Sequence, residues 1–468
     1  MKNLPSRIAA MMLLAPCVFL YLEISPAQTS PSALTATPTI KALSHNSRDD
    51  DGAAFTLSVV GSNFQSNSTV QVNGKALKTT FLGDKLLTAE VPGNSVRKTS
   101  DVTVLNPPKA VSNAMRIAVP CQIVASSSVP EEKRARVGVY YFDGWAGPMN
   151  KPGFDEALLQ QFGEREPLSG WQDDSACALN QQLAWAHDFG IDFFIFDWYF
   201  NPEKNAPGQN LNSAFNLTRS LPDRHGMQYA LMYVNHGPFV MSPDDWSTTI
   251  NEWVGYMGGS GYARINGKPL LVIYDVEMMR KTFGSSAAVA KALKQLRAAA
   301  TARGLPGVYI AGGFHPGYDL SSVRHSIPDL APTANEGYDA LTMYGYSVGG
   351  RTGEQKFSVL SDVGKWIWGQ VAEKSPLPFI PVVRDGWDER PDKSGGLWYA
   401  RTPDELAKFV KEAIAWADAH PKLRPEPPPN PPMIWIEAWN ELGEGSYLVP
   451  TVTDGTSYGD AVRKILVP

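Results

Sequence analysis

The stretch "SACALNQQLAWAHDFGIDFFIFDWYF", residues 175–200, contains both kinds of element from which most of this chain is predicted to be built. Its first half places Leu179, Leu183 and Ala186 on one face of a helix, which ends at Gly190. Its second half is an apolar run without alternation, which is typical of a strand buried on both faces. A helix followed directly by such a strand indicates a parallel sheet covered by helices.

The same apolar pattern recurs seven more times along residues 134–468, mostly with helical stretches between the runs. The other runs are "VGVYYFDGW" (137–145), "QYALMYVNH" (228–236), "KPLLVIYDV" (268–276), "GVYIAGGFH" (307–315), "YDALTMYGYS" (338–347), "FIPVVRDGW" (379–387) and "MIWIEAWN" (433–440). Eight buried strands alternating with helices predict a (β/α)8 barrel of the TIM type. A doubly wound sheet is the alternative, but no run is followed by a glycine-rich phosphate loop.

The N-terminus has the pattern of an export signal. Lys2 and Arg7 precede an apolar segment that is short for a membrane span, and "SPA" offers small residues for cleavage after Ala27. We therefore expect a signal peptide over residues 1–27 and a spacer over 28–36. The protein should be exported to the periplasm, the cell surface or the medium, with no stable membrane span after cleavage. An uncleaved membrane anchor is the alternative.

Short strands dominate residues 37–119. "AAFTLSVVGSNF" and "STVQVNGKAL" alternate in polarity, Asn73-Gly74 is a hairpin signal, and "LLTAEVP" and "DVTVLNP" add two strands. This spacing predicts a small β-sandwich. The segments "VVGSNF", "VQVNGKAL", "LTAEVP" and "VTVLNP" resemble an IPT/TIG domain, an immunoglobulin-like module. Such modules mostly act as spacers or adhesive units, and no catalytic pattern is present in this segment.

Cleavage of the signal would leave two cysteines, Cys121 and Cys177, near the junction of the two predicted domains. In an oxidising compartment they can pair. If they do, we expect the disulfide to tether this junction to the first barrel helix. Two separate buried thiols are the alternative.

The composition excludes some partners and favours others. Charged residues make up 19% of the 468 residues and hydrophobic residues 43%, as expected of a folded chain. The net charge of −5 provides no basic surface for nucleic acid. The 13 Trp and 17 Tyr are abundant, and aromatic rings form the flat apolar faces on which sugar rings stack.

Polar and aromatic residues recur where the predicted strands end, which is where barrel enzymes place their chemistry. One such residue by itself would be an ordinary structural residue, but the recurrence predicts a pocket for a neutral polyhydroxylated ligand. The predicted binding residues here are Tyr141, Asp143, Trp145, Asp197, Trp198, Tyr199, Asn235, His236, Tyr274, Asp275, Tyr344 and Trp387, with Tyr346, Arg384 and Asp385 beside them.

The last strand, "MIWIEAWNELGEG" (433–445), leads into three glutamates. With a period of two, Trp435, Glu437 and Trp439 should face the barrel axis. Glu437, Trp439 and Asn440 are therefore added to the predicted binding residues. Glu441 and Glu444 follow three residues apart, and in a helical turn they would lie on one side. Paired carboxyls separated by about 5–5.5 Å are what retaining glycoside cleavage requires.

The segments "AWNELGEGSYLVP", "GVYYFDGW" and "AHDFGIDFFIFDWYF" resemble the glycoside hydrolase family 99-like group, which contains endo-α-mannosidases and bacterial proteins labelled glycosyltransferases. The resemblance implies a retaining endo-glycosidase without metal or cofactor. It also implies that Glu441 takes the proton from the sugar 2-hydroxyl, giving a 1,2-anhydro intermediate, and that Glu444 is the general acid and then the base.

Two positions differ from this family's pattern, since Leu442 replaces an aromatic residue and Val449-Pro450 replaces Glu-Pro. The ending "EGSYLVP" is also similar to fungal α-1,3-glucanases of family 71. The expected substrate is therefore an α-linked glycan or polysaccharide, either α-mannan-like or an α-glucan. A glycosyltransferase and a noncatalytic glycan-binding surface protein are the alternatives.

Overall fold

The fold is taken from a computed structural model of the chain. It describes residues 36–45, 54–92, 100–117, 132–145, 158, 161–171, 173–200, 211–321, 325–391 and 396–467. The predicted signal peptide, all of the predicted spacer except Ala36, and Cys121 lie outside these residues. Cys177 takes part in a disulfide whose partner is not among the described residues.

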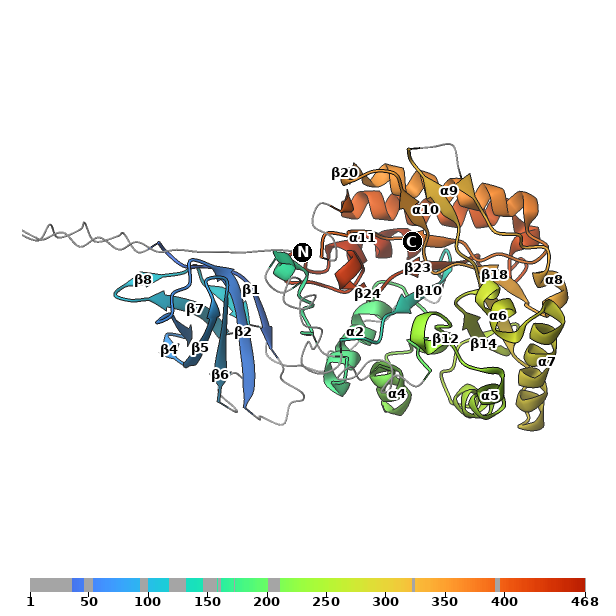
Figure 1. The fold of residues 1–468 in the computed structure, drawn as a ribbon, viewed down its shortest axis with the longest axis horizontal. Coiled ribbons are helices and arrows are strands. Elements are labelled where there is room, and N and C mark those ends of the chain that lie inside the picture. The colour runs from blue at the N-terminus through green and yellow to red at the C-terminus, as the bar shows by residue number, and fades with distance from the viewer. Residues whose placement is uncertain are drawn as a thin grey trace, which may run out of the picture. The chain divides into compact units, whose positions relative to one another are not determined.

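Eight parallel strands form the barrel predicted for the C-terminal part of the chain (Figure 1). They are paired in the order β18-β15-β14-β12-β11-β10-β23-β21, and a parallel bridge between Leu341 and Phe379 joins the two ends of this path. The strands are β10 (Arg136–Tyr141), β11 (Phe193–Trp198), β12 (Gln228–Tyr233), β14 (Lys268–Ile273), β15 (Tyr309–Gly313), β18 (Ala340–Thr342), β21 (Val382–Arg384) and β23 (Met433–Glu437). Each coincides with one of the eight apolar runs, with β10 beginning one residue before its run, so the barrel prediction is confirmed.

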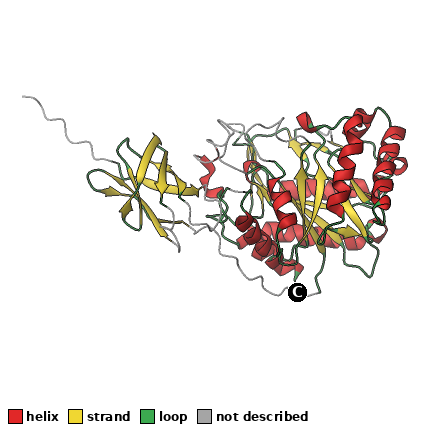
Figure 2. Ribbon diagram, turned by 90° about the horizontal axis from the view of Figure 1, so that it is seen from below, coloured by secondary structure: helices red, strands yellow, loops and turns green. Residues whose placement is uncertain are grey.

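Helices surround these strands (Figure 2). Ser175 caps α2 by accepting from the amide of Ala178, and Thr402 caps α10 by accepting from the amide of Glu405. The helices are α2 (Ala176–Asp188), α4 (Ser213–Ser220), α5 (Pro243–Met257), α6 (Val276–Phe283), α7 (Ser286–Ala302), α8 (Thr333–Glu336), α9 (Phe357–Lys374), α10 (Pro403–Ala419) and α11 (Ser457–Leu466). No helix within the described ranges is long and apolar enough to cross a membrane.

Short elements occupy the loops of the barrel region. They are β13 (Arg264–Ile265), β16 (Gly317–Asp319), β17 (His325–Ser326), β19 (Ser347–Gly349), β20 (Gly353–Lys356), β22 (Leu397–Ala400), β24 (Asn440–Glu441), β25 (Ser446–Tyr447) and the 3-10 helices η1 (Gly163–Arg165), η2 (Gly237–Phe239), η3 (Pro421–Leu423) and η4 (Leu442–Glu444). The pair β24–β25 and η4 contain the predicted catalytic glutamates.

The N-terminal part is built from two β-sheets around a core of its own. Leu57 and Leu87 of one sheet and Val70 and Val104 of the other belong to this core. The first sheet contains β1 (Thr39–His45), β2 (Phe55–Ser62), β6 (Leu86–Val91) and β5 (Lys78–Gly83); the second contains β4 (Lys75–Ala76), β3 (Thr69–Val72), β7 (Ser100–Asn106), β8 (Ala110–Val111) and β9 (Met115–Ile117). The all-β prediction is confirmed for these residues, and the IPT/TIG assignment stays a prediction.

Candidate active site

A tight hairpin presents Glu441 and Glu444 after the last barrel strand. Residues Asn440–Glu441 pair with Ser446–Tyr447, and the 3-10 turn Leu442–Glu444 lies between them. Glu441 precedes this turn as its N-cap and Glu444 is its last residue, so a single loop carries both carboxyl groups. Both are partly exposed. Gly445 closes the turn with a φ of 70°, a conformation that glycine adopts without steric cost.

Tyr344, two residues after β18, connects the hairpin to β11. Its hydroxyl lies 2.7 Å from Glu441 Oε1 and 3.1 Å from Asp197 Oδ2, at the end of β11. A phenol has one hydrogen to donate, so one of the two contacts requires a proton on the carboxyl group. Asp197 is 3% exposed, and burial raises its pKa well above the usual value. The Tyr344 hydroxyl, Glu441 Oε1 and Asp197 Oδ2 therefore share a proton of one carboxyl group in addition to the phenol proton.

Neighbouring charges also act on Glu441. Burial, followed by the carboxylates of Glu444 and Asp197, raises the pKa of Glu441 well above its usual value, and the Tyr344 hydrogen bond offsets part of this. Like charges held close together separate the protonation steps of a carboxyl pair. The site can therefore provide a proton donor and a proton acceptor at one pH.

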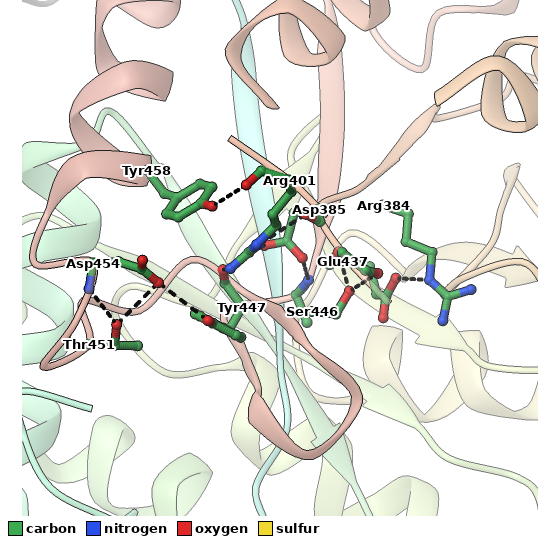
Figure 3. Close-up of polar contacts among 11 residues, drawn as sticks. Arg384, Asp385, Arg401, Glu437, Ser446, Tyr447, Thr451, Asp454 and Tyr458 are labelled. Atoms are coloured by element: carbon green, nitrogen blue, oxygen red, sulfur yellow. Dashed lines mark hydrogen bonds and ion pairs between the residues drawn. The ribbon is translucent and has the colours of Figure 1, made fainter. Parts of the chain in front are cut away.

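Glu437 lies beneath this pair rather than at the surface. It is fully buried, and its Oε2 lies 3.0 Å from Nε of Arg384 on β21 (Figure 3). Burial raises the pKa of Glu437 to about 8, although the Arg384 guanidinium acts in the opposite direction. A Cβ built on Gly345 would lie 3.2 Å from Glu437 Oε2, so a side chain there would crowd the carboxylate. The structure thus gives this predicted binding residue an ion-paired position with no exposed surface.

Several predicted aromatic residues do gather around the glutamates. The Tyr274 ring lies 5.7 Å from Tyr344 and 4.9 Å from His236. The Tyr199 pKa is raised well above its usual value by burial and by the nearby Asp197 and Glu441 carboxylates.

Trp387 adds a platform at the end of β21. It is half-buried and lies over the Arg384 guanidinium, whose Cζ is 4.1 Å from the ring centroid. The cation–π contact therefore fixes the position of a partly exposed indole near the predicted site.

Other predicted residues have structural partners away from the glutamates. Asp143 accepts from the amides of Ala214 and Phe215 and so caps α4. The side-chain amide of Asn235 donates to the carbonyl oxygen of Asp275 and accepts from its backbone amide. The Asp275 side chain also caps α6. These three residues hold loops in place.

Aromatic residues of the same prediction also point away from the barrel axis. Tyr141 donates to Asp173 at 2.7 Å, and the Trp198 ring meets Trp253 of α5 edge-on. The Trp145 indole donates to the carbonyl oxygen of Asn440, and the Asn440 amide pairs with the backbone of Phe142. These contacts anchor the start of the hairpin.

Trp439 does not face the barrel axis as predicted. Its indole donates to Gln182 of α2 at 2.8 Å and its ring lies 5.0 Å from Phe194. The strand β23 ends at Glu437, so the alternation of faces does not continue to Trp439.

Three residues near the site were missed by the sequence reasoning. His315, at the end of β15, lies 4.4 Å from the Tyr274 ring, and the rule of polar residues at strand ends would have found it. Arg165 and Asp388 contact the glutamate turn, but they lie in loops, where no periodic pattern marks them. No group of three or more metal-ligating side chains occurs in the part of the chain that the structure describes.

The fold and the site together define a parallel barrel with a carboxylate pair and aromatic side chains at the C-terminal ends of its strands. Residues 238–462 match the family model described as "Glycosyltransferase WbsX".

Two similar curated proteins are both described as "Uncharacterized protein WxcX", from Xanthomonas campestris pv. campestris strains B100 and ATCC 33913. Each is 26% identical, over 237 and 241 residues respectively, which is 48% of this chain in both cases. The chain matches only 30% of the length of these relatives.

Among solved structures, the chain is similar to the GH99 endo-alpha-mannosidase from Bacteroides thetaiotaomicron. The identity is 14% and the TM-score 0.46, covering 70% of this chain and 98% of that one. It is also similar to a family 1 b-glucosidase from Thermotoga maritima, with 12% identity and a TM-score of 0.41, covering 72% and 98%.

Proposed function

We propose that this protein is an exported glycoside hydrolase that cleaves α-linked glycans with retention of configuration, using Glu441 and Glu444. The observation that carries the proposal is the placement of these two partly exposed glutamates in one tight hairpin, Glu441 on β24 and Glu444 in the 3-10 turn, with Tyr344 bridging Glu441 to Asp197. A close carboxyl pair at the C-terminal edge of a barrel suits glycosyl transfer to water.

In the proposed mechanism Glu441 accepts the proton of the sugar 2-hydroxyl while that oxygen attacks the anomeric carbon. Glu444 donates a proton to the departing glycosidic oxygen, and a 1,2-anhydro sugar results. Glu444 then accepts a proton from water as the water opens the anhydro ring, and Glu441 returns its proton to the 2-oxygen. The raised pKa of Glu441 supports the first role, because a carboxylate with a higher pKa is a stronger base.

The surroundings of the pair support a sugar substrate. Trp387 and Tyr274 are partly exposed rings, and His236 is exposed beside Tyr274. Ring faces stack on the C–H surfaces of sugars, and imidazole nitrogens exchange hydrogen bonds with hydroxyls. An α-mannan-like polysaccharide and an α-glucan are the two substrate classes that we propose to test.

Glycosyl transfer is the second candidate, and it is favoured by the description of the matching family model. Both reactions break a bond at the anomeric carbon: hydrolysis breaks a glycosidic bond with water, whereas a glycosyltransferase moves the sugar from an activated donor, such as a nucleotide sugar, to a hydroxyl group. Incubation with α-mannans and α-glucans, with and without nucleotide sugars, followed by sizing of the products distinguishes them, because hydrolysis shortens chains without a donor whereas transfer lengthens them only with one.

The test of the glutamates compares Glu441→Gln and Glu444→Gln. Each should lower turnover by about 10²–10⁴-fold, the usual contribution of one acid–base group. A glycosyl fluoride, whose leaving group departs without a proton, should largely restore the first step of Glu444→Gln but not that of Glu441→Gln.

The matched control is Glu426→Gln. It removes a carboxylate that pairs with Arg136 at the opposite, N-terminal end of β10, and it should cleave at the wild-type rate. If Glu441→Gln and Glu444→Gln also keep the wild-type rate, the catalytic assignment is wrong and the glycan-binding alternative replaces it.

A further inference from the structure

A buried arginine from a distant loop contacts the turn that carries both glutamates. Arg165 is 5% exposed, and its Nη1 donates to the carbonyl oxygen of Leu442 at 2.9 Å. Its Nη2 forms an ion pair with Asp388. Leu442 lies between Glu441 and Glu444, so this guanidinium holds the middle of the turn.

Asp388 holds the other end of the same turn. Its backbone amide donates to the carbonyl oxygen of Glu444 at 2.6 Å. Its carboxylate also accepts from Arg390 Nε at 2.8 Å and from Nη2 at 2.6 Å. A Cβ built on Gly445 would lie 2.7 Å from the Cβ of Asp388, so the loop packs directly against the turn. The Arg165–Asp388 pair therefore contacts the turn at two carbonyl groups.

The backbone around Arg165 is itself fastened beside the turn. The amide of Leu168 donates to Pro450, and the amide of Val452 donates to Glu166, both at 2.8 Å. The Phe162 ring centroid lies 4.5 Å from Arg165 Cζ. A side chain fixed at its base and paired at its tip loses little further entropy in holding the turn.

The geometry points to Arg165 and Asp388 as positioning residues that fix the separation of Glu441 and Glu444. This inference rests on the proposed function of that pair. Neither side chain has to touch substrate; each acts on the backbone that carries the catalytic carboxyl groups. Displacement of a reacting group by about 1 Å can cost about 10²-fold in rate, so a looser turn should impair chemistry more than binding.

The test measures the titration of Glu441 as well as activity. In protein with ¹³C-labelled glutamate carboxyls, the Glu441 signal is assigned by its loss in Glu441→Gln. Loss of the Arg165 cation alone would raise the pKa of a nearby carboxyl, whereas relaxation of the turn would weaken repulsion by Glu444 and lower it. Arg165→Gln and Arg165→Lys should both lower the apparent pKa of Glu441. Asp388→Asn should have a smaller effect in the same direction.

The matched control is Arg136→Gln, since Arg136 also holds a backbone carbonyl and a carboxylate, at the start of β10. It should leave the Glu441 titration unchanged. On a cleaved glycan, the Arg165 variants should lose about 10- to 100-fold in kcat with little change in KM. If wild type cleaves none of the glycans, the hydrolase proposal fails while the titration still tests the positioning role. An unchanged or raised Glu441 pKa in folded Arg165→Lys overturns the inference.

Discussion

Single residues at the centre of this barrel differ chiefly in how far they are removed from water. Glu441 and Glu444 are partly exposed, whereas the nearby Glu437 and Asp197 are buried. Burial penalises the charged form of a carboxyl group, and it raises the pKa of Glu437, Asp197 and Glu441 alike. The same residue type therefore supplies exposed groups for chemistry and buried groups that hold arginine or tyrosine in place.

The raised pKa of Glu437 predicts a specific pH dependence of stability. Its pKa is about 8 in the folded protein against a usual value of 4.5, so the folded state binds more protons between these values. The free energy of unfolding should therefore fall as the pH rises from 4.5 to 8. Glu437→Gln cannot titrate and should show a smaller fall.

Urea unfolding of both proteins at pH 5 and pH 8.5 measures this difference. Arg384, Asp385, Glu444 and Ser446 surround Glu437 and are the same in both proteins. Burial also raises the pKa of Asp385 to about 7, so its titration adds a fall in stability with pH that both proteins share. Parallel pH profiles for wild type and Glu437→Gln would refute the prediction.

At the scale of elements, the hairpin Asn440–Tyr447 is the part of the molecule on which the proposed function depends. Its short ladder joins Glu441 to Ser446, and the Ser446 hydroxyl donates to Gly386 at 2.8 Å. Arg401 donates to the carbonyl oxygen of Tyr447 at 2.8 Å, and Figure 3 shows both residues. The hairpin is thus held by the loop after β21 rather than by its own few hydrogen bonds.

Gly445→Ala tests this dependence. The φ of 70° costs a non-glycine residue about 1–2 kcal/mol, and the new Cβ would also meet Asp388 at 2.7 Å. We expect stability to fall by more than that conformational cost, and turnover to fall with it. Chemical unfolding and kinetics on a cleaved glycan measure the two effects.

Gly284→Ala is the control, because Gly284 has a φ of 85° at the end of α6 and nothing within 4 Å of a built Cβ. It should show the conformational cost alone and normal turnover. Equal losses of stability in the two variants would mean that the contact with Asp388 is absorbed by small shifts.

At the scale of the whole molecule, two hydrophobic cores are separate. The main core of the N-terminal sheets contains residues between Ile40 and Ile117, and the barrel core begins at Ala135. Each part therefore has a core of its own on which to fold.

Deletion of residues 37–119 should leave the proposed chemistry intact, since all proposed catalytic and substrate-contacting side chains lie in the barrel. Turnover of a small soluble glycan by the folded deletion variant should stay close to that of the full chain, and circular dichroism can confirm that the barrel is folded. Complete loss of turnover in a folded variant would show that the N-terminal sheets contribute to the reaction.

The sequence by itself determined the barrel and the two-sheet N-terminal part. Each strand of a parallel barrel is covered on both sides, so runs such as "IDFFIFDWYF" are apolar on both faces. This pattern can be recognised from the local sequence alone. Glu441 and Glu444 are three residues apart, so one tight hairpin carries both, while their catalytic roles stay a prediction. Export, the IPT/TIG assignment and the substrate class stay predictions.

Only the tertiary structure decided which polar residues surround the glutamates. Tyr344 and Asp197 lie 147 positions apart in sequence, and Arg165 and Asp388 lie 223 apart, yet each pair is in contact. Asp143 follows β10 and Asp197 lies near the end of β11, but Asp143 caps a helix and Asp197 meets Tyr344. Residue type and strand position are local properties, whereas the partner of a buried carboxylate is set by the closure of the barrel and the packing of its loops, which no local pattern encodes.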